Sequence, residues 1–167
     1  MNSKTEQVAI VDSKNRVIGS APRHRMRARG LTHRATYILV FNSKGEIFVQ
    51  ERTKSKDIYP GYFDVATGGV MLAGESYKES AARELAEELG IKNVPLTSHF
   101  DFFHEENKNR VWGRVFSCCY DGAITLQKEE VADGSFMPVS EALQMAESKQ
   151  FTPDGLLVLK RYLAEQE

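Results

Sequence analysis

Apolar residues along the chain gather in short runs that turn-forming residues separate, a pattern typical of β-strands. The clearest run is TYILVF at 36–41, and the turn residues NSKG at 42–45 connect it to a second predicted strand at 46–52. Further strand structure is expected as a hairpin over 7–19, a short strand at 64–66, two strands over 95–103 and 110–120 with a polar loop between them, and a last short strand at 136–139.

A central helix is predicted between residues 76 and 89. Ser76 precedes Glu79 by three residues, the spacing of a capping box, in which each side chain accepts a hydrogen bond from the other residue's backbone amide. Gly90 stands where a left-handed residue would end the helix after Leu89. Later in the chain, Ser140 should cap a helix that runs to about 147, and Thr152-Pro153 should open one that runs to about 164.

Two faces of the central helix differ in chemistry. Spacings of three and four residues place one set of apolar side chains on a face that should pack inward: Ala81, Ala82, Leu85 and Leu89. Glu84, Glu87 and Glu88 share another face. Like charges at this spacing repel each other by roughly a few tenths of a kcal/mol per pair. The last turn of a helix also disfavours anions.

A divalent cation would remove this conflict, because Mg²⁺ and Mn²⁺ prefer carboxylate oxygen and water as ligands. The alternative is a solvated acidic face in which Glu79 and Arg83 form an i,i+4 ion pair. The glycines favour the first interpretation, since Gly68-Gly69 and Gly74 flank a loop whose backbone can approach a ligand closely.

The arrangement of these elements indicates the fold class. Strands before and after a central helix, with more helices at the end, are typical of an α+β or α/β sandwich. A length of 167 residues suits one domain with a full core, so we expect a single domain over 1–167, with an N-terminal hairpin and connector at 1–30 and the core at 31–167. The connector 22–30 is rich in arginine and is interpreted as a solvated loop, the alternative being the border of a phosphate site.

Composition excludes several function classes. With a net charge of −1, the chain has no basic field for nucleic acid or an anionic membrane. No apolar run approaches the roughly 20 residues of a membrane-spanning helix, and the N-terminal residues do not resemble a secretory signal, so a cytoplasmic location is expected. Cys118 and Cys119 are adjacent and are interpreted as buried strand thiols.

Residues 69–91 carry a specific motif. They match G-x5-E-x7-R-E-U-x-E-E-x-G-U at every position, where U is a bulky aliphatic residue. This is the Nudix box, so the chain resembles the Nudix hydrolases. The surrounding sequence, above all 31–69 with RVWGRVFSC at 110–118 and FTPDGL at 151–156, resembles the YfcD branch, whose relatives include isopentenyl diphosphate isomerase. The resemblance implies an α/β/α sandwich with a central mixed sheet, in which the box forms a loop-helix-loop.

The resemblance also implies a reaction and a set of site residues. Nudix proteins hydrolyse a diphosphate linkage, typically of a nucleoside diphosphate derivative, with Mg²⁺ or Mn²⁺, by water attack on phosphorus. By position, Glu84, Glu87 and Glu88 would be metal ligands and one of them the general base, and the Gly69 carbonyl would be a further ligand. Arg83 and Glu75 should form a pair that holds the loop against the helix. A later loop, with Glu129 and Glu130, is a second possible source of the base. The family is often homodimeric, so a homodimer is possible.

Substrate contacts are less specific in the sequence. Arg34, Arg52 and Arg110 are candidate phosphate partners, with Glu130 as a further substrate contact and surface ion pairs as the alternative. One or two aromatic residues are expected to line the pocket and stack on a base, and the rest to lie in the core. The candidates are Tyr37, Tyr59, Tyr62, Phe63, Phe102, Phe103 and Trp112.

The sequence disfavours three other functions. The isomerase pattern places a cysteine and a histidine around a glycine, whereas this chain has Thr67-Gly68-Gly69, so isomerisation is disfavoured. A non-catalytic nucleotide-sensing module would show damaged box carboxylates, and none is damaged. RNA decapping would need a larger basic or aromatic surface than the connector provides.

Overall fold

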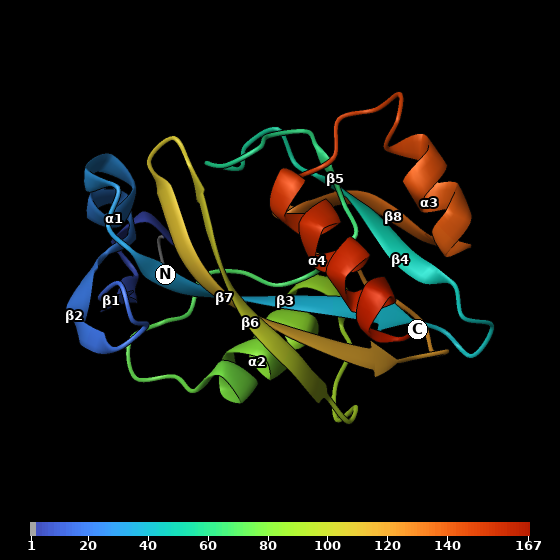
Figure 1. Ribbon diagram of the computed structural model, residues 1–167, viewed down its shortest axis with the longest axis horizontal. Helices are drawn as coiled ribbons and strands as arrows, with labels where there is room; N and C mark the ends of the chain where they lie inside the picture. The colour runs from blue at the N-terminus through green and yellow to red at the C-terminus, as the bar shows by residue number, and fades with distance from the viewer. Residues whose placement is uncertain (1–2) are drawn as a thin grey trace.

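A mixed β-sheet forms the centre of the computed structural model, which describes residues 3–167 (Figure 1). In chain order the strands are β1 (Gln7–Val11), β2 (Val17–Pro22), β3 (His33–Phe41), β4 (Ile47–Arg52), β5 (Phe63–Asp64), β6 (Thr97–Glu106), β7 (Asn109–Cys119) and β8 (Val131–Met137). The helices are a short 3-10 helix η1 (Ser3–Thr5), then α1 (Arg23–Arg29), α2 (Tyr77–Leu89), α3 (Val139–Met145) and α4 (Pro153–Glu165).

Strand β3 lies at the middle of the sheet. On one edge it pairs in parallel with β7, from His33 opposite Val111 to Phe41 opposite Cys119, while the other strand pairs are antiparallel. Its other edge meets β1 at one end, β4 at the opposite end, and the loop after β5 in between. In that loop the Gly69 carbonyl accepts a hydrogen bond from the Thr36 amide at 3.0 Å. The glycine-containing start of the motif is therefore fixed against the central strand.

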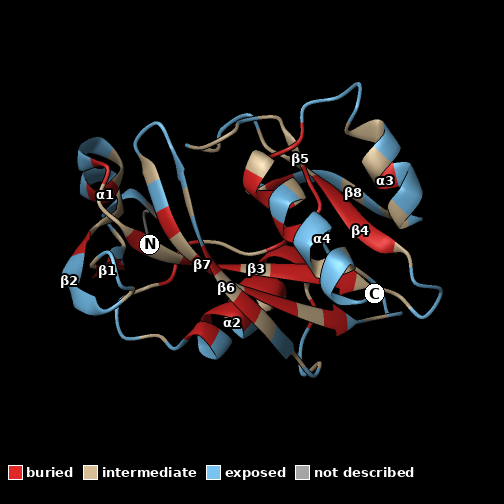
Figure 2. Ribbon diagram, in the orientation of Figure 1, coloured by how far each residue is buried: buried red, intermediate tan, exposed pale blue. Residues whose placement is uncertain are grey.

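Helices cover both faces of the sheet, as the alternation of side chains along β3 requires. Ile38 and Val40 pack with the apolar residues of α2, whereas Leu39 between them packs with residues of α3 and α4. Buried residues accordingly run along β3, β4 and the inward side of α2 (Figure 2). The predicted α/β/α sandwich, of the α+β class, is confirmed.

Helix α2 begins and ends where the sequence predicts. The Ser76 hydroxyl accepts a hydrogen bond from the Glu79 amide at 3.1 Å, and the Glu79 carboxylate accepts one from the Ser76 amide at 3.0 Å. Gly90 ends the helix in the left-handed region with φ 69°. The inward face is narrower than predicted: Ala82 is exposed, because Glu84 and Glu88 occupy the buried side next to Leu85 and Leu89.

The connector 22–30 is the largest departure from the expected elements. It contains helix α1 rather than a solvated loop, and Gly30 ends this helix in the left-handed region with φ 61°. Met26 anchors α1, since its side chain is 1% exposed and packs with apolar residues of β1 and β2. Arginine, methionine and alanine are good helix formers, so the charge run concealed a one-sided helix.

Two smaller expectations also change. Strand β8 begins at Val131 rather than near 136, because it pairs with β4 from Arg52 opposite Val131 to Ile47 opposite Met137. Its sequence, VADGSFM, contains aspartate and glycine, which strands usually avoid. Cys118 is buried as predicted, but Cys119 is exposed, because adjacent residues of a strand point to opposite faces.

Candidate active site

The carboxylates of α2 divide into a buried pair and an exposed third. Glu84 and Glu88 lie one turn apart and are 9% and 4% exposed, whereas the Glu87 side chain is 50% exposed. Burial, together with the charge of Glu84 and a hydrogen bond with it, raises the pKa of Glu88 well above its usual range. Two buried carboxylates that face each other require a proton or a cation between them.

Arg83 connects the helix to the loop that precedes it. Its Nε and Nη2 donate to the two carboxylate oxygens of Glu75 at 2.6 and 3.0 Å, and Glu75 Oε1 also accepts the Leu72 amide at 2.8 Å. Arg83 Nη1 donates to Glu84 and Glu87 at 3.1 and 3.2 Å. The structure thus places Arg83 beside Glu75, as predicted, and not beside Glu79, which takes part in the helix cap.

The oxygen atoms at this site fit a hard divalent cation. Gly69 lies directly against Glu84: a Cβ added to Gly69 would be 2.9 Å from Glu84 Oε1. The Gly69 carbonyl already accepts the Thr36 amide, but a carbonyl oxygen has a second lone pair. Over the described part of the chain, no group of three or more acidic, histidine or cysteine side chains is preformed around one point. Arg83 Nη1 lies between Glu84 and Glu87 and donates to both carboxylates.

Two neighbouring cavities open at this site. The first, here called the carboxylate cavity, is lined by Glu84, Glu87 and Glu88 and by Glu129 and Glu130 from the loop before β8. The second, here called the sheet cavity, is lined by residues of β3, of the loop after β4 and of the start of α4. Four residues line both cavities: Arg23, Lys56, Gly68 and Gly69. The two cavities are therefore adjacent parts of one site.

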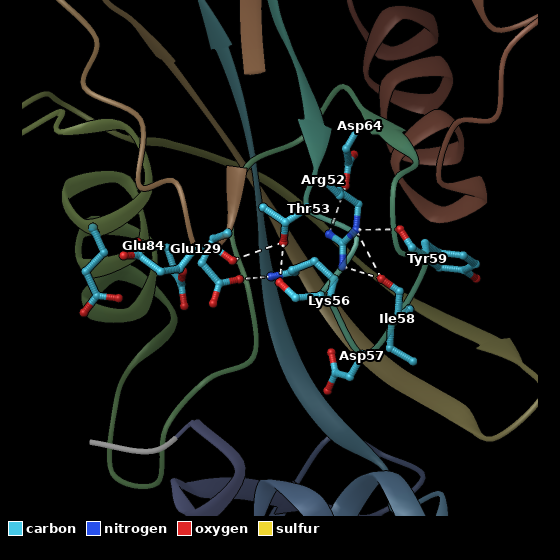
Figure 3. A network of polar contacts seen from close by, with 12 residues as sticks. Arg52, Thr53, Lys56, Asp57, Ile58, Tyr59, Asp64, Glu84 and Glu129 are labelled. Carbon is cyan, nitrogen blue, oxygen red and sulfur yellow. Dashed lines mark hydrogen bonds and ion pairs between the residues drawn. The ribbon is translucent and has the colours of Figure 1, made fainter. Parts of the chain in front are cut away.

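Lys56 stands at the junction of the cavities. Figure 3 shows it between Glu84 and Glu129 on one side and Arg52 and Asp64 on the other. Its Nζ forms an ion pair with the Glu130 carboxylate. The sequence pattern gave no signal for Lys56, since a lone lysine in a polar loop is ordinary.

Three arginines surround the sheet cavity. Arg52 lines it, as a phosphate partner should, although its Nε and Nη2 donate to the carbonyls of Ile58 and Tyr59 at 2.7–3.2 Å (Figure 3). Arg23 and Arg27 of α1 also line it. Although burial raises the pKa of Asp57, the charges of these two arginines lower it to about 2.

Acidic and hydroxyl side chains line the inner part of the sheet cavity: Thr36, Tyr37, Asp64, Thr152 and Asp154. The Tyr37 hydroxyl donates to Asp154 Oδ2 at 2.7 Å. Burial raises the pKa of Asp64 to about 7; the Arg52 charge opposes this shift and the Asp154 charge adds to it. Nothing in the sequence singled out Asp154, because acidic residues are common in the first turn of a helix, where they interact favourably with the helix dipole.

Two predicted substrate residues lie elsewhere. Arg34 donates to the Asn15 side chain and carbonyl at 2.8 and 2.7 Å and lies over the Tyr77 ring, so its guanidinium fixes the turn between β1 and β2. Arg110 forms an exposed ion pair with Glu105 on the β6–β7 hairpin. Neither arginine is among the residues that line the two cavities.

Of the aromatic candidates, Tyr37 and Tyr59 line the sheet cavity. The other five candidates pack against aromatic rings: Phe63 against Phe151, Phe102 against Tyr37, Phe103 against Trp112, and Tyr62 against Tyr59. The expectation that one or two aromatic residues line the pocket agrees with this placement.

Comparison with known proteins identifies the family. The NUDIX domain matches residues 31–157. A Nudix hydrolase of Pseudomonas aeruginosa is 49% identical over 161 residues, which cover 96% of this chain and 95% of that protein. The Nudix hydrolase YfcD of Escherichia coli is 45% identical over 161 residues, covering 96% and 88%. The chain therefore belongs to the Nudix family, whose hydrolases act on pyrophosphate bonds, and the predicted likeness to the YfcD branch is confirmed.

Solved structures agree on the fold. DR0079 from Deinococcus radiodurans superposes with a TM-score of 0.80 at 22% identity, covering 93% of this chain and 98% of that one. The MutT protein from Methanosarcina mazei Go1 gives a TM-score of 0.71 at 25% identity, covering 81% and 96%. The relation to isopentenyl diphosphate isomerase stays a prediction. None of the helices in residues 3–167 combines the length and hydrophobicity needed to cross a membrane.

Proposed function

We propose that this protein hydrolyses a diphosphate linkage by metal-dependent attack of water on phosphorus, and that its substrate is a nucleoside diphosphate derivative. One observation carries the proposal. Glu84, which forms a buried pair with Glu88, lies against Gly69, at the point where the carboxylate cavity meets a second cavity lined by Lys56 and Arg23. Acidic ligands for a metal thus stand beside basic partners for phosphate.

The three box glutamates would hold Mg²⁺ or Mn²⁺, with Glu84 and Glu88 as the buried ligands and Glu87 at the exposed side. When bound, such an ion neutralises phosphate charge and lowers the pKa of a water molecule. Arg83 would position Glu84 and Glu87 through the hydrogen bonds it already donates to them. Glu75 would fix Arg83 in turn, so that the loop carrying Gly69 keeps its place against α2.

Lys56 and Arg23 would bind the phosphate oxygens, because both line the two cavities at their junction. Lys56 is paired with Glu130, so a phosphate would compete with that carboxylate for the ammonium group. The general base would be a glutamate of the carboxylate cavity, either in the box or from Glu129 and Glu130. Arg52 would contribute charge to the sheet cavity while its donors hold the 53–62 loop.

The proposal is tested by product release from a panel of compounds, with Mg²⁺ or Mn²⁺ and again with a chelator. The panel holds nucleoside di- and triphosphates, nucleotide sugars, dinucleotides, coenzyme A and isopentenyl diphosphate. Cleavage of one diphosphate class that stops on chelation is the expected result. Cleavage that continues at the same rate after chelation would contradict the metal requirement, and isomerisation of isopentenyl diphosphate would contradict the reaction type.

A further inference from the structure

Helix α1 supplies two arginines to the site from outside the NUDIX domain. The helix spans Arg23–Arg29, whereas the domain begins at residue 31. Arg23 and Arg27 lie one turn apart and both line the sheet cavity, and Arg23 also lines the carboxylate cavity. Their side chains are only 19% and 20% exposed. Two cations at this spacing repel each other, and their burial makes a partner of opposite charge necessary.

Asp57 is that partner. It lies in the loop between β4 and β5, next to Lys56 in the chain (Figure 3). Its Oδ2 accepts a hydrogen bond from Arg27 Nε at 2.9 Å and one from Arg23 Nε at 3.5 Å. Asp57 is not among the residues that line the sheet cavity or the carboxylate cavity. Its carboxylate therefore contacts the site through the two arginines.

Asp57 engages only the Nε atom of each arginine, and this leaves terminal nitrogens for another partner. Arg27 Nη1 donates to Asn109 Oδ1 at 3.2 Å, so Arg27 is held from two sides. Among residues 3–167, no hydrogen bond is donated by Arg27 Nη2 or by either terminal nitrogen of Arg23. A guanidinium group has five N–H donors in a fixed plane that matches the oxygens of a phosphate. The unused donors are therefore suited to an anion in the cavities that these arginines line.

We propose that Asp57 is a positioning residue for phosphate binding. It holds Arg23 and Arg27 by their Nε atoms beside the two cavities, so that the free terminal nitrogens bind the anionic part of the substrate. Asp57 itself does not touch the substrate. This inference deepens the proposed function and rests on it for the identity of the anion as a diphosphate. It also makes α1, which precedes the NUDIX domain, one wall of the phosphate site.

Removal of Asp57 separates positioning from simple electrostatics, because the two predict opposite results. Without Asp57 the site loses a negative charge, and Coulomb attraction alone would make an anion bind more tightly. If the carboxylate is needed to hold the arginines, its loss weakens binding instead. The two guanidinium groups would then repel each other without a counter-charge, and ordering them around the anion would cost conformational entropy.

The test is calorimetric binding of inorganic pyrophosphate to metal-free protein, prepared with a chelator and then dialysed, so that hydrolysis does not enter. Asp57→Ala should weaken binding by about threefold to tenfold. Asp57→Asn keeps an acceptor for one Nε atom, so its affinity should lie between those of the wild type and Asp57→Ala, and it serves as the test variant if the alanine variant does not fold. Asp121→Ala is the matched control, because this exposed carboxylate, bonded to Ser43, lines neither cavity and its removal changes the net charge equally.

A second comparison assigns the effect to the arginines. In an Arg27→Ala background, Asp57→Ala should change the affinity by about twofold or less, because the main group that Asp57 positions is absent. The inference would be overturned if the folded Asp57 variants bound pyrophosphate as tightly as the wild type or more tightly. The same loss of affinity in the Arg27→Ala background, or no binding of pyrophosphate by the wild type, would also overturn it. Chelator-sensitive cleavage by the wild type would still stand in each case, so the two proposals fail separately.

Discussion

Arg83 and Glu75 form a two-pronged ion pair, with Nε and Nη2 of the arginine 2.6 and 3.0 Å from the two oxygens of the glutamate. The two side chains are 24% and 17% exposed, so the pair is partly shielded from water. It connects α2 to the loop that carries Gly69. The geometry of the site therefore depends on a pair that makes no contact with the sheet cavity.

Replacement of Arg83 by lysine should destabilise the protein by about 1–3 kcal/mol, because an ammonium group cannot donate to both oxygens in parallel. The diphosphatase rate should fall as well, since Glu84 and Glu87 lose a donor. Urea unfolding measures the first effect. Arg16→Lys is the control: the Arg16 side chain is 70% exposed in its pair with Asp12, and the change should be small. Equal effects of both variants would show that the Arg83–Glu75 pair contributes no more to stability than an exposed ion pair does.

Gly68 should not tolerate a side chain. Its φ is +146°, and a Cβ there would overlap the Thr36 carbonyl of β3. Gly68→Ala should therefore lower the free energy of unfolding by about 2 kcal/mol or more, or prevent folding, because the loop would have to separate from the strand. Gly19→Ala is the matched control, since nothing lies within 4 Å of an added Cβ there. Thermal unfolding of the two variants tests this, and a Gly68→Ala melting temperature equal to the control's would contradict the described packing.

Asp64 should make stability depend on pH. Its pKa of about 7 in the folded protein lies above the ordinary 3.8, so the folded state binds a proton more tightly than the unfolded chain. The resulting stabilisation is complete below about pH 4 and is lost as the pH rises to 7, on the order of a few kcal/mol in total. Arg52, Asp154 and Thr152 are the groups that face this carboxyl.

Asp64→Asn removes this titration while it keeps an acceptor for the Ala66 amide. The melting temperature of the variant minus that of the wild type should therefore rise between pH 4 and 7. A series of melts in buffers of constant ionic strength measures the difference. Parallel profiles for the two proteins would mean that Asp64 is ionised across the whole range.

The sequence predicts those structural features that depend on residues close together in the chain. Both ends of α2 follow from local signals, Ser76 with Glu79 at one end and Gly90 at the other, and both are confirmed. The positions of most strands along the chain and the sandwich architecture also follow, because turn residues separate the apolar runs clearly. The helical nature of 23–29 was missed, since its one buried residue, Met26, stands in a run of charges.

Contacts between distant segments could not be predicted in this way. Asp64 and Asp154 are brought together because the Phe63 amide and carbonyl bond to Gln150 and Thr152, which seats the start of α4 beside β5. No local sequence pattern predicts this pairing between β5 and the residues before α4. The position of Arg34 could not be predicted for the same reason, because its partner Asn15 lies in the turn between β1 and β2. Site residues of the box could be named from the motif and the family resemblance that it carries, whereas those of the sheet cavity required the tertiary structure.

The most direct test of the account is the Mg²⁺-dependent diphosphatase rate of Glu88→Gln, measured on the best substrate of the panel. Glutamine keeps the size of the side chain but removes a charge that the bound metal requires, so the rate should fall by about a hundredfold or more while the fold is retained. Glu79→Gln, on the same helix, is the matched control, because glutamine also completes a capping box. An undiminished rate in folded Glu88→Gln would contradict the proposed metal site.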